Sequence, residues 1–228
     1  MTALAVLDAF CCAGGATRGY QLAGFDEVDG IDIDPQPNYV GNHFLQMDGI
    51  IGIREYGPSF DLIHMSPPCQ FSTALTKGTN KHLGTSKPRA KINLIGPARE
   101  AAISTGRPWV LENVQGSEVR RDVTLCGTYF GLKVFRHRYF ELGGGAEDMV
   151  PDVVHEKHAG RVTGWRHGVK YAGEYFAVYG DGGGKGSVQD WQRAMGMDWT
   201  DVKHELSEAI PPAYTEYIGR HILKGLTS

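Results

Sequence analysis

The sequence has few cysteines, and their spacing argues against two common kinds of site. The four cysteines among 228 residues are an adjacent pair and two isolated residues: Cys11, Cys12, Cys69 and Cys126. They lack the paired spacing of a cysteine metal site and the regular framework of a disulfide-rich secreted domain. We therefore expect reduced thiols, no bound metal and a cytoplasmic compartment.

Long apolar runs are also missing. No stretch approaches the roughly 18–20 apolar residues that a membrane helix needs, so we expect no membrane partner. Residues 1–8 hold no basic residue and bring Asp8 into their apolar stretch, which favours a buried strand over a signal peptide. With 41% hydrophobic and 21% charged residues, the chain is typical of one globular domain, alone or with a small subdomain.

Excess positive charge is absent overall, but charge is unevenly distributed along the chain. The net charge is −3, which argues weakly against nucleic acid as a partner. Residues 1–60 contain two basic and eight acidic residues, whereas residues 61–141 contain twelve basic and six acidic ones. This asymmetry is expected if one part binds a small cofactor and another faces phosphates.

Short apolar strands alternate with helical patterns in the first half, which predicts an α/β fold with a mostly parallel, Rossmann-like sheet. In such sheets ligands bind outside the carboxyl ends of the strands, and the polar clusters of this sequence follow strands. We expect strands at 5–10, 28–33, 60–65 and 109–114, and helices from 17–23, 92–105, 190–195 and 214–223.

The pattern breaks down after residue 143, where a stretch rich in glycine, histidine and tyrosine begins. We expect a cofactor-binding and catalytic domain at 1–142, a small loop-rich or β-rich target-recognition region at 143–187, and a helical return segment at 188–228. The middle region interleaves basic and aromatic side chains, which suits nucleic-acid contact, although a plain surface subdomain is the alternative. These side chains are Lys157, Trp165, Arg161, Arg166, Lys170, Tyr171 and Tyr175.

A glycine-containing turn at residues 10–15, between a strand and a helix, would let the backbone approach a ligand closely. A tight structural turn is the equal alternative. Asp32 ends the next strand, where an acid accepts hydrogen bonds from ribose hydroxyls, although a simple turn role is also open. The dinucleotide fingerprint Gly-x-Gly-x-x-Gly is missing, which disfavours nicotinamide and flavin cofactors. The two features together favour a ligand that carries a nucleoside.

The most informative stretch is 66–70, Ser-Pro-Pro-Cys-Gln. Its prolines stiffen the backbone after an apolar strand and would hold Cys69 at the sheet edge. A basic loop without acids follows at 77–91, which favours an activated thiol, although a buried structural cysteine and a solvated loop remain alternatives. Glu112 ends another apolar strand, where burial would raise its pKa and make it a proton donor; a capping or ion-pair role is the alternative.

In their order along the chain these segments resemble the motifs of the DNA (cytosine-5)-methyltransferase family. The resemblance covers most of the chain. It rests on residues 8–15, 32–35, 47–49, 67–70, 112–114, 136–138, 190–199 and 209–212. The sequence departs from the family pattern where Cys12 replaces a glycine, where Val134 replaces a glutamine, and where Ser207 and Glu208 replace a Gly-Asn pair.

The resemblance implies a fold of the class I methyltransferase type, S-adenosylmethionine as cofactor, and methyl transfer to C5 of a flipped cytosine in a short sequence of double-stranded DNA. It implies a covalent adduct of Cys69, with Glu112, Arg136 and Arg138 as further catalytic residues. It places the cofactor against Phe10, Cys11, Cys12, Ala13, Gly14, Gly15, Asp32, Ile33, Asp48, Gly49 and Pro67. It places DNA against Gln70, Ser72, Lys77, Lys81, Lys87, Arg89, Arg161 and Arg166.

Other functions remain open at this stage. An RNA (tRNA) cytosine-5 methyltransferase would show the same motifs, and a non-catalytic DNA-binding homologue is a further alternative, although intact Cys69 and Glu112 argue against it. A thiol redox protein is disfavoured because no Cys-x-x-Cys pair is present. We expect a monomer in the cytoplasm of a bacterial or phage-infected cell.

Overall fold

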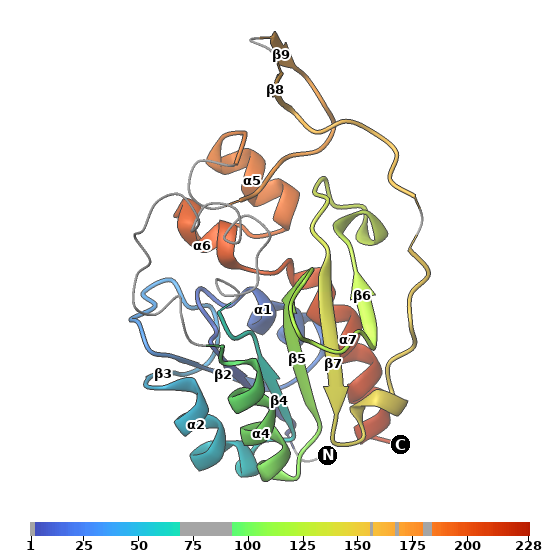
Figure 1. Cartoon of the computed structure of the whole chain (residues 1–228). Coiled ribbons are helices and arrows are strands. Elements are labelled where there is room, and N and C mark those ends of the chain that lie inside the picture. Colours follow the sequence, from blue (N-terminus) through green and yellow to red (C-terminus); the bar gives the residue numbers. More distant parts are fainter. Residues whose placement is uncertain (1–2, 69–92, 156, 167–168, 180–183) are drawn as a thin grey trace.

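A seven-stranded sheet forms the centre of the computed structural model, which describes residues 3–68, 93–155, 157–166, 169–179 and 184–228 (Figure 1). The strand order is β3-β2-β1-β4-β5-β7-β6, and only β7 pairs antiparallel to its neighbours. The strands are β1 (Ala5–Ala9), β2 (Glu27–Asp32), β3 (Phe44–Gln46), β4 (Leu62–Met65), β5 (Trp109–Val114), β6 (Val123–Leu125) and β7 (Arg138–Gly143).

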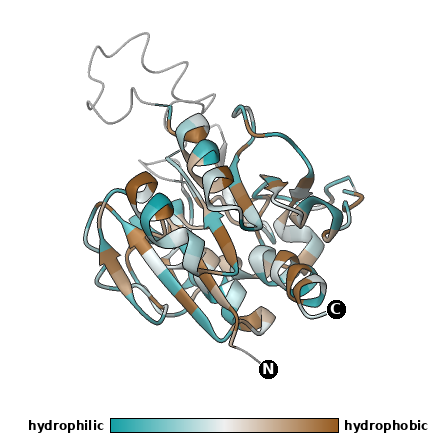
Figure 2. Cartoon of the chain, turned by 90° about the horizontal axis from the view of Figure 1, so that it is seen from below, coloured by the Kyte–Doolittle hydropathy of each residue, from teal (hydrophilic) through white to brown (hydrophobic). Residues whose placement is uncertain are grey.

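Helices cover both faces of this sheet, as the sequence predicts. Alternate strand residues point to opposite faces. Val6 and Val110 pack in a cluster with α1 (Gly15–Ala23) and α7 (Pro212–Leu226). Leu7 and Leu111 pack on the other face with α2 (Gly49–Tyr56) and α4 (Ile95–Thr105). The helices alternate between hydrophilic and hydrophobic positions, as expected for helices with one buried side (Figure 2). The expected Rossmann-like, mostly parallel fold is confirmed.

Element boundaries agree with the sequence analysis where the apolar pattern is strong. The strand expected at 109–114 is β5, and the helix expected at 92–105 begins at Ile95, with Pro97 in its first turn. The helix expected at 190–195 begins at Val188, two residues earlier, after a capping box between Ser187 and Asp190. Elements that we did not predict are α2, β3, β6, β7 and the short helix α6 (Lys203–Glu208).

The region at 143–187 contains one hairpin in the part that the structure describes. Strands β8 (Gly164–Arg166) and β9 (Val169–Tyr171) pair antiparallel and project from the body, at the end where α5 (Val188–Met195) and α6 lie (Figure 1). The base of the hairpin is tied by backbone hydrogen bonds between Thr163 and Tyr175, and Phe176 bonds to Lys133. The hairpin is thereby fastened to the chain just before β7.

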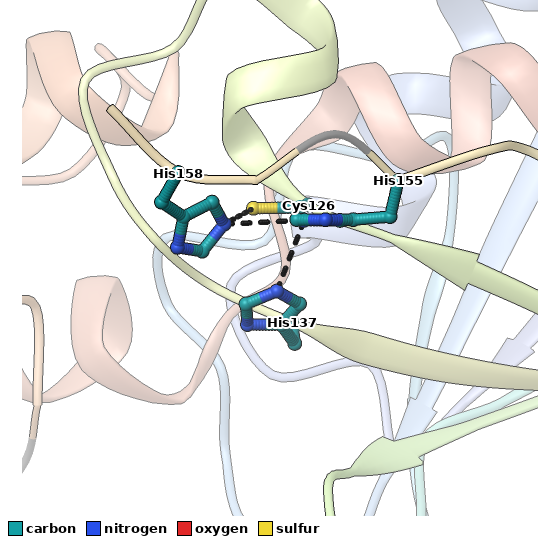
Figure 3. Close-up of side chains that lie close together, drawn as sticks. All are labelled: Cys126, His137, His155 and His158. Atoms are coloured by element: carbon teal, nitrogen blue, oxygen red, sulfur yellow. Dashed lines mark hydrogen bonds between the residues drawn. The ribbon is translucent and has the colours of Figure 1, made fainter.

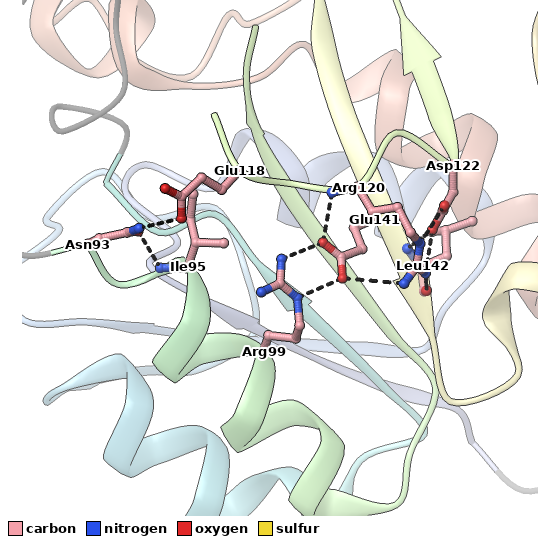
Figure 4. A network of polar contacts seen from close by, with 8 residues as sticks. All are labelled: Asn93, Ile95, Arg99, Glu118, Arg120, Asp122, Glu141 and Leu142. Atoms are coloured by element: carbon pink, nitrogen blue, oxygen red, sulfur yellow. Dashed lines mark hydrogen bonds and ion pairs between the residues drawn. The ribbon is translucent and has the colours of Figure 1, made fainter. Parts of the chain in front are cut away.

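A buried polar network fixes β7 against α4 (Figure 4). Both oxygens of Glu141 on β7 accept hydrogen bonds of 2.7 Å from the Arg99 guanidinium of α4. The Arg120 backbone N–H donates to the same carboxylate, and the Arg120 side chain pairs with Asp122. Because a buried carboxylate is tolerated only when it is paired, this network specifies the position of β7. No helix among the described residues is long and apolar enough to cross a membrane.

Helices α1 and α7 approach each other closely at glycines. A Cβ atom on Gly19 would lie 2.2 Å from the Pro212 carbonyl oxygen and 2.0 Å from Thr215 Oγ1 of α7. On Gly219 of α7, a Cβ atom would lie 2.8 Å from the Ala23 side chain. The two helices therefore leave no space for even a methyl group at these contacts.

We expect Gly19→Ala to destabilise the protein by about 1–3 kcal/mol, because α7 must move to accept the methyl group. Gly96→Ala is the matched control. A Cβ on Gly96 meets nothing within 4 Å outside its chain neighbours; the helix propensity of alanine stabilises and the following Pro97 opposes it, so the effect should stay within about 1 kcal/mol of wild type. Urea unfolding curves of the three proteins measure the difference. Equal stability of the two variants would contradict the close packing.

Candidate active site

The carboxyl ends of β1, β2, β4 and β5 lie side by side at one edge of the sheet. The sheet order places β1 between β2 and β4, with β5 on the far side of β4. The loop at residues 10–14 follows β1, Ile33 follows β2, and Ser66 follows β4. Glu112 and Asn113 lie near the carboxyl end of β5. The sequence-predicted cofactor and catalytic segments are thus brought together in the described part of the chain.

The loop after β1 has an unusual backbone. Phe10 has a φ of 61° and Cys12 a φ of 49°, both in the left-handed region that favours glycine, and Gly14 follows with 87°. Such conformations cost free energy and persist where the surroundings determine them. Here Asp32 accepts a 3.1 Å hydrogen bond from Cys12 N–H, and Trp199 Nε1 donates to the Ala13 carbonyl. Cys12 adopts the backbone that the family's glycine would adopt easily.

Two further segments border this loop. Phe10 lies so close to Gly49 that a Cβ atom there would be 2.9 Å from its ring. Asp48, expected to contact the cofactor, is the N-cap of α2 and accepts hydrogen bonds from the N–H groups of Ile50 and Ile51. Ile33 is an exposed large apolar side chain. We call the loop at residues 10–14, Asp32, Ile33 and Gly49 the shelf; it combines polar and apolar groups at the carboxyl ends of β1 and β2.

A second carboxyl group, that of Asp8, lies on β1 just before this loop. Asp8 on β1 is fully buried, and its Oδ2 accepts a 2.6 Å hydrogen bond from the Thr17 hydroxyl. Its Oδ1 has no hydrogen-bond partner among the described residues. Burial raises the pKa of Asp8 to about 7, and the hydrogen bonds of Thr17 oppose this shift without cancelling it. The carboxyl group of Asp8 therefore gains and loses its proton near neutral pH.

Glu112 is buried at the end of β5 and lies against Arg138. Arg138 Nε is 2.8 Å from Glu112 Oε1, and both side chains are shielded from solvent. Burial raises the pKa of Glu112, while Arg138, Arg136 and a hydrogen bond with Ser66 oppose the rise. Glu112 and Arg138 meet because β7 runs antiparallel to β5, which puts the first residue of β7 beside the last residue of β5. A carboxyl group in this setting is suited to donate a proton.

The segment that leads to Cys69 is held from β5. The Asn113 side chain, which is buried, donates a 2.9 Å hydrogen bond to the Pro67 carbonyl. His64 of β4 contacts the Ser66 hydroxyl at 3.0 Å and the Tyr20 hydroxyl at 2.9 Å, and burial lowers its pKa to about 3, which keeps the ring neutral. Cys69 lies outside the described residues, as do Gln70, Ser72, Lys77, Lys81, Lys87 and Arg89.

The paired arginines differ in their contacts. Arg136 is buried and donates to the backbone carbonyls of Val178 and Ser207, which ties the region after the hairpin to the end of α6. Arg138 contacts the carboxylate of Glu112. Arg161 is exposed in the segment before β8. Arg166 ends β8, and the position of its side chain lies outside the description.

The described cysteines differ in reactivity. Burial raises the pKa of Cys12 to about 12 and that of Cys11 further, so neither is a ready nucleophile. Burial also raises the pKa of Cys126, but hydrogen bonds from Thr128, His155 and His158 outweigh it and lower the pKa to about 7. The polar surroundings of Cys126 could not be predicted from the sequence, because His155 and His158 come from a segment about 30 residues away along the chain.

The raised pKa of Asp8 predicts a pH dependence of stability. Between pH about 4 and 7 the folded chain keeps a proton that the unfolded chain releases, so the free energy of unfolding should fall as pH rises. Asp8→Asn removes this decline and should be more stable than wild type above pH 7, by a few kcal/mol at most. Urea unfolding from pH 4 to 8 measures it, with exposed Asp198→Asn as control. Parallel pH profiles for wild type and Asp8→Asn would rule out the titration.

No family model matches the chain, and no curated protein matches it in sequence. Solved structures do match in fold. A protein assigned as a DNA modification methyltransferase, encoded within an E. coli prophage, is 13% identical with a TM-score of 0.56 over 99% of this chain and 100% of its own. The Dnmt2 methyltransferase of S. pombe is 16% identical with a TM-score of 0.54 over 99% and 100%.

A methyltransferase of Entamoeba histolytica, EhMeth, is 11% identical with a TM-score of 0.62 over 100% of both chains. At these identities the likeness concerns the fold alone. The likeness confirms the Rossmann-like fold, of the class I methyltransferase type, that was expected from the sequence.

Proposed function

We propose that the protein is an S-adenosylmethionine-dependent methyltransferase that acts on C5 of cytosine in DNA. The observation that carries the proposal is the buried Glu112, which lies against Arg138 at the end of β5; the next residue, Asn113, bonds to the Pro67 carbonyl. A buried carboxyl group with a raised pKa would be the proton donor, and Cys69, which follows the two prolines in the sequence, would be the nucleophile. The fold shared with methyltransferases supports the same assignment.

The shelf at the ends of β1 and β2 fits the proposed cofactor. Asp32 accepts hydrogen bonds from the N–H groups of Cys12 and Asp34, and a carboxylate has lone pairs for about two more donors, such as ribose hydroxyls. Exposed Ile33 and the ring of Phe10 suit an adenine face. S-adenosylmethionine bound there would supply an electrophilic methyl group, and the remaining loop residues Cys11, Ala13, Gly14 and Gly15 would enclose it.

The chain's own residues would activate the base. The Cys69 thiolate adds to C6 of cytosine while protonated Glu112 donates its proton to N3, and the electron density gained at C5 makes that carbon nucleophilic. After methyl transfer a base from the solvent takes up the C5 proton, the bond between Cys69 and C6 breaks with its electron pair returning to sulfur, and Glu112 recovers the N3 proton. Arg138 orients the Glu112 carboxyl group through their contact. Because C5 and C6 lie within the stack, the base must be flipped out of the duplex.

DNA is the proposed partner because basic residues collect in the middle of the sequence, where residues 61–141 hold twelve of them against six acidic residues. The loop at 77–91 carries five basic residues and no acid. The projecting hairpin and Arg161 in its stem would contact the duplex, which gives the region at 143–187 the role of target recognition (Figure 1). So small a region reads few base edges, which favours a short recognition sequence.

RNA is the alternative substrate, because the same side chains would act on a flipped cytosine in tRNA. Transfer of tritium from labelled S-adenosylmethionine to duplex DNA, compared with tRNA, separates the two. Label in tRNA alone would move the proposal to RNA. Label in neither substrate, with the cofactor bound, would favour a non-catalytic DNA-binding protein.

Cys69→Ser should abolish methyl transfer, because a serine hydroxyl does not ionise near neutral pH. Cofactor binding, measured by calorimetry, should survive because Cys69 is not part of the proposed shelf. DNA that contains 5-fluorocytosine cannot lose the C5 substituent as a proton, so it should trap wild type as an adduct stable in denaturing gels. The mechanism fails if wild type gives no adduct under turnover conditions.

Glu112→Gln should slow methyl transfer by about 10²–10⁴-fold, because the amide has no acidic proton for N3. Single-turnover rates with duplex DNA measure the effect, and cofactor affinity should change little. Glu216→Gln on α7, whose carboxylate pairs with Arg220, is the matched control and should retain full rate. Near-wild-type activity of Glu112→Gln would place the acid elsewhere.

A further inference from the structure

Four side chains with metal-binding atoms converge beyond β6, outside the residues used by the proposed reaction (Figure 3). Cys126 follows the last residue of β6, and His137 precedes the first residue of β7. His155 and His158 lie in the long segment that runs toward the hairpin. The Sγ atom and the imidazole nitrogens lie within 4.8 Å of one another.

Three contacts within this cluster come within a few tenths of an ångström of the spacing in a tetrahedral coordination shell. Cys126 Sγ is 3.3 Å from His158 Nε2, His158 Nε2 is 3.1 Å from His155 Nε2, and His155 Nε2 is 3.1 Å from His137 Nε2. Zinc binds nitrogen at about 2.0–2.1 Å and sulfur at about 2.3 Å, so ligand atoms of a tetrahedral site lie about 3.3–3.6 Å apart. The three contacts join all four ligand atoms.

Hydrogen bonding alone accounts poorly for this arrangement. A ring nitrogen of histidine carries either a proton or a lone pair, never both. His155 Nε2 therefore cannot donate to one neighbouring nitrogen while it accepts from the other, yet it lies 3.1 Å from both. A cation at the centre would accept an electron pair from each of the four atoms. The same Nε2 atom of all three rings faces the centre, as coordination requires.

The surroundings hold the ligands in place. Phe135 stacks on His158 with ring centroids 4.2 Å apart and on Tyr175 at 4.0 Å. The Thr128 hydroxyl donates to Cys126 Sγ at 3.3 Å. Partners of this kind orient the ligands of metal sites and stabilise the site.

We propose that Cys126, His137, His155 and His158 form a structural zinc site. A soft thiolate combined with imidazoles in a tetrahedral set favours Zn²⁺, and four protein ligands leave no open position for catalysis. The ion fastens the segment that leads into the β8–β9 hairpin to the sheet edge where Arg138 lies. This proposal replaces our expectation of no metal, which considered the cysteine spacing alone.

Metal analysis of the full chain tests the site without any assay of methyl transfer, so its outcome is independent of the proposed function. After expression with zinc and removal of loosely bound metal, wild type should hold about one zinc ion per chain by mass spectrometry. Cys126→Ser and His158→Asn should weaken zinc binding by about 100-fold or more. His204→Asn, which changes an exposed histidine beside Glu208, is the matched control and should retain the metal.

A cobalt measurement on wild type covers the case in which a ligand variant fails to fold. Co²⁺ in this set should give the strong visible bands of a tetrahedral site and a near-ultraviolet sulfur-to-metal band. Chelation should also make Lys157 and Arg161 more accessible to trypsin. Less than about 0.2 zinc per chain without these cobalt bands would overturn the site, as would wild-type zinc content in both ligand variants or a different metal at full occupancy. Unchanged trypsin cleavage after chelation would overturn the fastening role.

Discussion

The antiparallel placement of β7 between β5 and β6 determines which polar groups meet in this protein. Because β7 returns along β5, Arg138 at its start reaches Glu112 at the end of β5. The same strand carries Glu141, whose buried carboxylate binds Arg99 of α4 and fixes the strand from the other side. His137 directly precedes the strand and faces away to the metal-ligand cluster. A shift of β7 would therefore separate Arg138 from Glu112, Glu141 from Arg99, and His137 from its cluster.

Burial makes the acids of the site chemically different from one another. Asp8 and Glu112 are enclosed, and desolvation raises the pKa of each, whereas Asp32 accepts hydrogen bonds from the N–H groups of Cys12, in the strained loop, and of Asp34. A single edge of the sheet therefore offers one carboxyl group that shapes the loop and two buried carboxyl groups whose pKa is raised. In the proposed function these are the ribose acceptor and the proton donor, and their separation follows from position along the strands.

Sequence patterns predicted the strands with a marked apolar pattern. β1, β4 and β5 are buried along nearly their whole length, and β2 buries Val28, Gly30 and Ile31, so their positions were evident. β7 was hidden because Arg138 and Glu141 interrupt its apolar residues, and their partners Glu112 and Arg99 lie far away in sequence. Glu112, Asp32 and the loop at residues 10–14 lie at the same edge of the sheet, as their positions at the ends of predicted strands indicated. The cluster of Cys126 and three histidines was missed since its ligands come from separate segments. Asp48, which the motif resemblance assigns to cofactor contact, is the N-cap of α2 in the structure.

The hairpin β8–β9 has a consequence for how this protein can diversify. Its described attachments are at the base, through Thr163, Tyr175 and Phe176, and the described clusters that pack the sheet contain no residue of β8 or β9. Changes of length or sequence in the hairpin therefore leave the free energy of folding nearly untouched. Lineages of such a chain could exchange one hairpin for another in few steps, without any compensating change in the core.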